Sequence, residues 1–258
     1  MERLGRERLV VVLSLAGVVG LAWLWLWRQA VAMEMSGVQM AGMAMSMPAP
    51  APADALGLSL VFFMWVVMMV GMMLPSAAPA ILLYGSLVRK HAERGRVLPA
   101  VWIFAVGYLL AWTAFSFGAA LLQAVLRHAA LLDAMMSSSS RILNGALLTA
   151  AGVYQFTPLK HRCLSKCREP LPFFIAHWRE GKAGALRMGM RHGAYCVGCC
   201  AMLMLLLFAL GVMSLAWVAA LAALILVEKL LPAGPLTARA FGAALVLLGV
   251  ATLLYQAT

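Results

Sequence analysis

The chain has 258 residues, of which 64% are hydrophobic and only 11% are charged, and its formal net charge is +11. A soluble globular domain is about half apolar and about a quarter charged, so this composition excludes an ordinary soluble domain. It predicts an all-α, polytopic membrane helix bundle whose main partner is the lipid bilayer.

Apolar stretches long enough to cross about 30 Å of hydrocarbon recur along the chain, and none alternates as a barrel strand would. They run roughly over residues 9–27, 57–84, 98–122, 139–157, 194–227 and 237–256. We therefore expect about six transmembrane helices. The predicted parts are an N-terminal transmembrane anchor (1–27), a Met/Pro-rich outer loop (28–56) and a five-helix membrane core (57–258) with a Cys-containing cytoplasmic loop (158–193). The alternative for the first stretch is a cleaved signal peptide.

Basic residues predict the orientation of the chain. With the N-terminus inside, 15 of the 20 Lys and Arg residues fall in inner segments. The five outer ones are Arg28, Arg127, Arg141, Lys229 and Arg239. This positive-inside bias predicts a multi-pass protein of the bacterial inner membrane with both termini and the Cys-containing loop in the cytoplasm, where thiols stay reduced. Because the basic residues are scattered along loops, we expect no nucleic-acid partner.

The predicted outer loop is rich in methionine. Its thioethers belong to Met33, Met35, Met40, Met43, Met45 and Met47. A solvent-exposed segment has no packing reason to hold them, and thioethers are ligands for Cu(I) or Ag(I). The alternative is a low-complexity Ala/Met linker with a biased composition.

The second apolar stretch repeats methionine every four residues. Met64, Met68 and Met72 therefore share one face of a helix. Pro75 and Pro79 follow, and each frees a backbone carbonyl that a neighbour must satisfy. Methionine in a helix is usually a flexible core filler. The density of this cluster beside two prolines favours weak metal sites within the bilayer.

The cysteines are gathered late in the chain. Cys163 and Cys167 are four residues apart, so a helix places both on one face. A second group, His192, Cys196, Cys199 and Cys200, forms one stripe on a continuous helix. Thiolates suit Cu(I) and also zinc, so this spacing favours a metal site. The alternatives are a redox dithiol or buried thiols that only pack.

These motifs also resemble a known family. The likeness covers roughly residues 57–250. Its carriers are Trp65, Met68-Met69, Met72-Met73, Pro75, Pro79, Tyr154-Gln155, Pro158, Lys160, Cys163, Cys167-Arg168, Pro170, Gly189, His192-Gly193, Tyr195-Cys196, Gly198-Cys199-Cys200, Gly211 to Leu215 and Glu228-Lys229. With these residues the chain resembles the bacterial family of predicted metal-binding integral membrane proteins, a domain of unknown function. The resemblance implies metal binding and no established activity. Ala201 stands where the family often has Trp.

The expected function is the binding or translocation of Cu(I) through Met and Cys ligands, with zinc as the other candidate metal. Phosphate-binding loops, nucleophile elbows and helical zinc-protease motifs are lacking, so we do not expect an enzyme. One alternative is an accessory or assembly subunit of a larger membrane metalloenzyme, with other membrane subunits or a metal chaperone as partners. The other is a membrane thiol oxidoreductase.

Overall fold

The computed structural model describes residues 2–42, 55–91, 97–129, 131–132, 140–212, 214–231 and 234–255. Within these ranges every element is a helix, which confirms the predicted all-α class. The long helices are α1 (Glu2–Gly42), α2 (Ala55–His91), α3 (Val97–His128), α7 (Gly181–Leu205) and α10 (Gly234–Leu254). The short ones are α4 (Arg141–Tyr154), α5 (Pro158–Arg168), α6 (Pro170–Ala176), α8 (Leu207–Leu210) and α9 (Leu215–Leu230).

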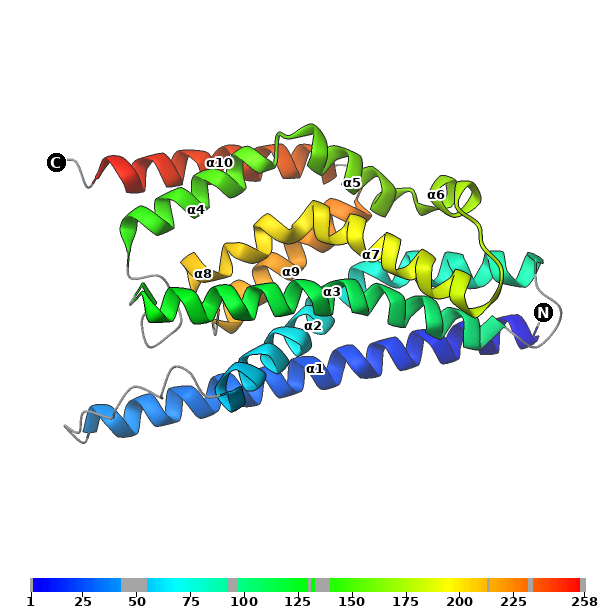
Figure 1. The fold of residues 1–258 in the computed structure, drawn as a ribbon, viewed down its shortest axis with the longest axis horizontal. Coiled ribbons are helices and arrows are strands. Elements are labelled where there is room, and N and C mark those ends of the chain that lie inside the picture. The colour runs from blue at the N-terminus through cyan, green and yellow to red at the C-terminus, as the bar shows by residue number, and fades with distance from the viewer. Residues whose placement is uncertain are drawn as a thin grey trace.

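Helices α3 and α7 lie at the centre of the bundle, with α1 and α2 on one side and α4 and α10 on the other (Figure 1). In the described part of the chain, five segments are long and apolar enough to cross a membrane. They are Arg6–Ala32, Leu56–Lys90, Val97–His128, Gly181–Leu210 and Gly234–Leu254. The expected span at 139–157 is α4, whose 14 residues reach only about 21 Å.

The sequence prediction of one long span over residues 194–227 is wrong, because the chain turns back within it. Gly211 has a φ of +96°, a conformation that ends a right-handed helix and favours glycine. The helical path through α7 and α8 therefore stops there, and α9 returns beside it (Figure 1). The predicted loop at 158–193 also differs: it holds α5, α6 and the first half of α7.

This turn changes where the ends of the chain lie. The start of α1 and the end of α10 are at opposite ends of the longest axis (Figure 1), whereas the sequence predicted both termini on one side. Arg168 of α5 donates to the Glu228 carbonyl at 2.6 Å and lies against Gly234. The start of α10, which carries Arg239, is therefore beside α5 and not on the predicted outer side.

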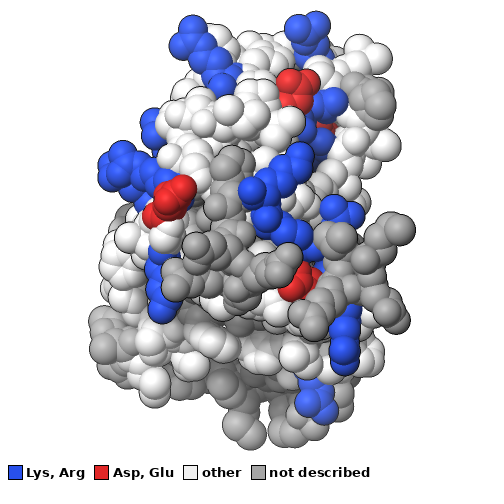
Figure 2. Space-filling model, turned by 90° about the vertical axis from the view of Figure 1, so that its right-hand side faces the viewer, with Lys and Arg blue, Asp and Glu red and all other residues white. Residues whose placement is uncertain are grey.

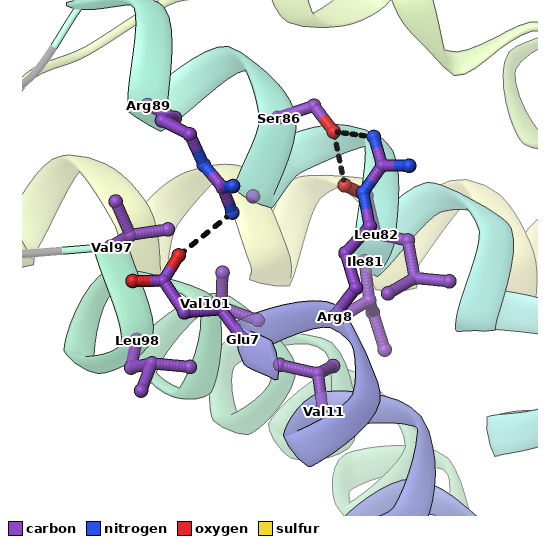
Figure 3. Close-up of a pocket in the computed structure, with 11 residues that line it drawn as sticks. Glu7, Arg8, Val11, Ile81, Leu82, Ser86, Arg89, Val97, Leu98 and Val101 are labelled. Carbon is purple, nitrogen blue, oxygen red and sulfur yellow. Dashed lines mark hydrogen bonds and ion pairs between the residues drawn. The ribbon is translucent and has the colours of Figure 1, made fainter. Parts of the chain in front are cut away.

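Basic side chains gather at the end of the molecule that holds the start of α1 (Figure 2). There α1 is joined to α2 around a small pocket (Figure 3). Glu7 pairs with Arg89 at 2.9 Å, and Arg8 donates to Ser86 at 3.1 Å. Helix α1 continues through Gly42, so part of the predicted outer loop is helical. Met43, Met45 and Met47 lie outside the described residues.

Proline and glycine set how the central helices approach one another. Pro75 cannot donate to the Gly71 carbonyl one turn earlier, and the Trp23 indole nitrogen of α1 donates to that oxygen at 3.2 Å. Between α7 and α3, a Cβ at Gly189 would meet the Phe104 carbonyl. Such close backbone contact needs small residues. It presses the middle of α7, where the cysteines lie, against α3.

Candidate metal centre

Three cysteine sulfurs from two helices converge near the centre of the bundle. The ligand atoms of Cys167, Cys196 and Cys199 all lie within 4.8 Å of one another. Cys167 Sγ, from α5, is 3.9 Å from Cys199 Sγ, from α7. Cys200 adjoins this sulfur group, with its Sγ 3.2 Å from that of Cys199. A single soft ion can therefore reach three sulfurs after small side-chain rotations.

Local sequence explains how the two helices present these thiols. Thr157 caps α5 by accepting a hydrogen bond from the Lys160 backbone, and Pro158 stands at the first helical position, which suits its fixed φ. On α7, Cys196 and Cys199 are three residues apart and so occupy neighbouring positions on one face. The Cys199 thiol donates to the Cys196 carbonyl at 3.1 Å.

The cysteines of the sulfur group differ in how deeply they are buried. Cys196, Cys199 and Cys200 are each at most 2% exposed. Cys167 is partly exposed. Cys167 is therefore the most exposed residue of the sulfur group.

Cys163 lies one turn before Cys167 on α5, as the spacing predicted, but outside the group of three. It is buried, and its sulfur lies against Gly198 of α7, where an added Cβ would come within 2.8 Å of it. Burial raises the pKa of the Cys163 thiol. The structure thus separates the two cysteines of α5: Cys167 joins the sulfur group and Cys163 packs between the helices.

His192 is on the same helix as the sulfur group but points into a cage of aromatic rings. Its ring centroid lies 6.0 Å from those of Phe104 and Tyr108 and 5.9 Å from those of Phe173 and Phe174. In the described residues its Nδ1 has no hydrogen-bond partner. The structure therefore does not bring His192 into the sulfur group, because the ligands converge toward α5 rather than along α7.

The methionines predicted as ligands in the second apolar stretch lie inside the bundle. Met68 and Met72 are each 1% exposed and Met64 is 7% exposed. They belong to the hydrophobic core, which fits both a core filler and a weak ligand. Their role as metal ligands stays a prediction.

Lys229 is a candidate site residue that the sequence prediction did not include among the metal-site residues. Its ammonium donates to Cys196 Sγ at 2.9 Å and to Ser76 Oγ at 3.0 Å, and the residue is 6% exposed. The sequence had placed Lys229 in an outer segment as an orientation charge. The signal was present in the chain, since a Glu-Lys pair closes an otherwise apolar run of α9. An ionisable pair inside a membrane-type helix is by default a functional candidate.

Two further polar contacts surround the sulfur group. The Tyr108 hydroxyl is 3.0 Å from Cys196 Sγ and also donates to the Met73 carbonyl at 3.2 Å. Lys160 of α5 pairs with Glu228 of α9 at 2.8 Å, and both side chains are 1% exposed. This buried ion pair joins α5 to α9 and so helps to hold Cys167 in place.

The fold and the site together define an all-helical bundle with a buried cysteine group suited to a soft metal ion. A family model described as PpoB2, copper chaperone, matches residues 62–252. That is more than half of the chain, so the chain belongs to this copper-chaperone family. No curated protein and no solved structure matches the chain significantly. The match begins within α2 and ends within α10, and it includes every cysteine.

The family supports the copper part of the sequence prediction. The resemblance to metal-binding membrane proteins is borne out as far as a copper-related family. Copper binding also fits the cysteine group.

Proposed function

We propose that this protein is a membrane-embedded copper chaperone that holds Cu(I) between Cys167, Cys196 and Cys199. The observation that carries the proposal is the convergence of these three sulfurs within 4.8 Å, from two helices. Thiolate sulfur is the preferred donor for Cu(I). Structural zinc sites are almost always tetrahedral with four ligands, whereas three sulfurs lie mutually within 4.8 Å here and Cys200 adjoins only one of them, Cys199.

The partly exposed Cys167 is the point at which we propose that the ion reaches the sulfur group. Copper enters at the partly exposed Cys167 and passes to Cys196 and Cys199, which are buried. Return along the same route delivers copper to a partner by thiolate exchange. The partner is a metal chaperone or a subunit of a membrane metalloenzyme, as the assembly-subunit alternative also requires.

The methionines fit a step in which the ion is bound more weakly, before it reaches the cysteines. The Met-rich segment at residues 33–47 would collect Cu(I) or Ag(I), and Met64, Met68 and Met72 would offer weak sites between it and the thiolates. Thioether binds more weakly than thiolate, so such an order leads the ion toward the cysteines. This part of the proposal also includes translocation across the bilayer.

The location that fits the chain is the bacterial inner membrane, with the basic end in the cytoplasm. Five segments have the length and apolar character of spans, and the basic end is visible in Figure 2. Under the positive-inside rule this end faces the cytoplasm. Because the chain ends are at opposite ends of the bundle (Figure 1), this orientation places the C-terminus outside.

The test is the metal content and Cu(I) affinity of the detergent-purified full chain. We expect about one tightly held copper per chain, displaced only by a strong Cu(I) chelator. X-ray absorption at the copper edge should show sulfur as the neighbouring atom. A protein that binds zinc with full occupancy and Cu(I) only weakly, or that binds neither, would contradict the proposal.

A further inference from the structure

The buried ammonium of Lys229 touches the sulfur group and has no carboxylate partner. Its two hydrogen bonds go to Cys196 Sγ and Ser76 Oγ. In the part of the chain that the structure describes, neither ion pair includes Lys229. The nearest acid along the chain, Glu228, is already paired with Lys160 at 2.8 Å. A buried charge is expensive unless an opposite charge compensates it.

Among the described residues, the hydrogen-bond partners of this ammonium are therefore a hydroxyl and the sulfur of Cys196, and of these two the sulfur is the one that can carry a negative charge, as a thiolate. The other described side chains around the site are not acids: they are a serine, Tyr108 and, one turn earlier on α7, a histidine held among aromatic rings. Lys229 and the sulfur group thus form one electrostatic unit. Its low exposure means that water screens the interaction little.

A fixed positive charge acts differently on monovalent and divalent ions. With the same thiolates, the site holding a monovalent ion carries one more negative charge than the site holding a divalent ion. The ammonium is attracted more strongly to the more negative complex. The same effect can be stated for the ions themselves, since the ammonium repels a divalent ion twice as strongly as a monovalent one at the same position.

We infer that Lys229 is a selectivity residue, which biases the sulfur group toward monovalent soft cations and against divalent ones such as zinc and cadmium. The inference rests on the proposed function, since it concerns the same three sulfurs. It assigns to Lys229 a role that metal ligands alone do not have. The three cysteines can bind either class of ion, and the lysine sets the ratio.

The experiment compares Ag⁺ and Cd²⁺, two redox-inert ions that both bind thiolates, on the purified full chain at one pH. The measured quantity is the ratio of their dissociation constants. For Lys229→Met we expect this ratio to move at least about tenfold toward Cd²⁺, as a unit charge in close contact requires. Lys229→Gln is the second neutral variant, in case the first does not purify. Lys229→Arg keeps the charge and should keep the ratio.

Two controls separate selectivity from folding. Ser76→Ala removes a hydrogen bond of Lys229 but keeps its charge, so the ratio should stay as in the wild type. The double variant Glu7→Gln with Arg89→Met removes the ion pair between α1 and α2, away from the sulfur group, without changing the net charge, and it should also leave the ratio unchanged. Equal weakening of both ions in the neutral Lys229 variants, or a shift below about tenfold, overturns the inference. If the wild type binds neither ion, the proposed function itself fails.

Discussion

Cys167 of α5 and Cys199 of α7 bring their sulfurs to 3.9 Å although they are 32 residues apart in the chain. The contact joins the short helix α5, whose Cys167 is partly exposed, to the buried cysteines of the long helix α7. It makes the sulfur group depend on how α5 is docked. Predictions about metal binding therefore concern both the ligands and the packing that holds them.

Replacing Cys196 and Cys199 together with Ser should abolish tight Cu(I) binding. Ser keeps the size of each side chain and removes the soft donor. We expect the affinity to fall by more than about a hundredfold, because even partners outside the ligand shell alter metal affinity by about 10–100-fold. Competition with a Cu(I) chelator measures this.

The matched control is Cys163→Ser, a buried cysteine outside the group of three. Its copper affinity should stay close to that of the wild type. If the Cys163 variant loses copper as fully as the double variant, the ligands have been assigned to the wrong sulfurs. If the double variant binds copper normally but leaves a larger complex, the cysteines are structural contacts.

Thiol labelling should distinguish the partly exposed Cys167 from the more deeply buried cysteines of α7. In native detergent-purified protein, a hydrophilic maleimide should react with Cys167 well before Cys196 and Cys199, which are at most 2% exposed. Bound Ag⁺ should protect Cys167. Mass spectrometry of the digested protein identifies the labelled residues. Rapid labelling of Cys196 with slow labelling of Cys167 would contradict the proposed route.

The parts of this site that local spacing determines were predictable from the sequence, and the parts that depend on packing between distant segments were not. Periodicity predicted the faces that carry Cys163 with Cys167 and Cys196 with Cys199, because local spacing determines a helix face. It could not predict that Cys167 joins the α7 thiols while Cys163 packs against Gly198. Which of the two cysteines joins the α7 thiols depends on the angle at which α5 packs against α7. The Lys160–Glu228 pair, which links α5 to α9, helps to fix this angle.

The all-α class of the fold was predictable from the sequence, but the path of the chain through the bundle was not. Composition alone predicted a helical membrane-type bundle. Hydropathy could not show the turn at Gly211, because the residues on both sides are equally apolar and only a φ of +96° breaks the helix. The same error placed Lys229 in an outer segment, since a span that does not turn back carries its last residues away from the cysteines.

Copper affinity should fall as the pH drops. Cysteine binds metal as the thiolate, so protons compete with Cu(I) for the same sulfurs. The dissociation constant should therefore rise steadily as the pH falls from about 8 to about 6. If several thiols are ligands, the rise should be steeper than the release of a single proton would cause. The measurement is chelator competition at a series of pH values, with the chelator's own protonation included. Affinity independent of pH over this range would contradict the prediction, because it would mean that no protonated cysteine becomes a ligand.

The buried ion pair should be more important to folding than to metal choice. Lys160→Met leaves Glu228 charged in the bundle without its partner, and breaking a buried pair in this way costs about 3–5 kcal/mol. The double variant Lys160→Met with Glu228→Gln should recover most of that loss. Thermal unfolding in detergent compares the two. Equal destabilisation of the single and double variants would mean that Glu228 is compensated by other groups.

The last prediction concerns the two ends of the chain. The start of α1 and the end of α10 lie at opposite ends of the bundle (Figure 1), because the chain turns back at Gly211. With the basic end in the cytoplasm, a reporter that is active only outside the cytoplasm should work when fused after Thr258. A reporter that fluoresces only inside should work when fused before Met1. A fusion after Leu210, where α8 ends, should report the same outer side as the C-terminus. If both termini report the cytoplasm, then α9 does not return through the membrane, and the ammonium of Lys229 cannot reach Cys196.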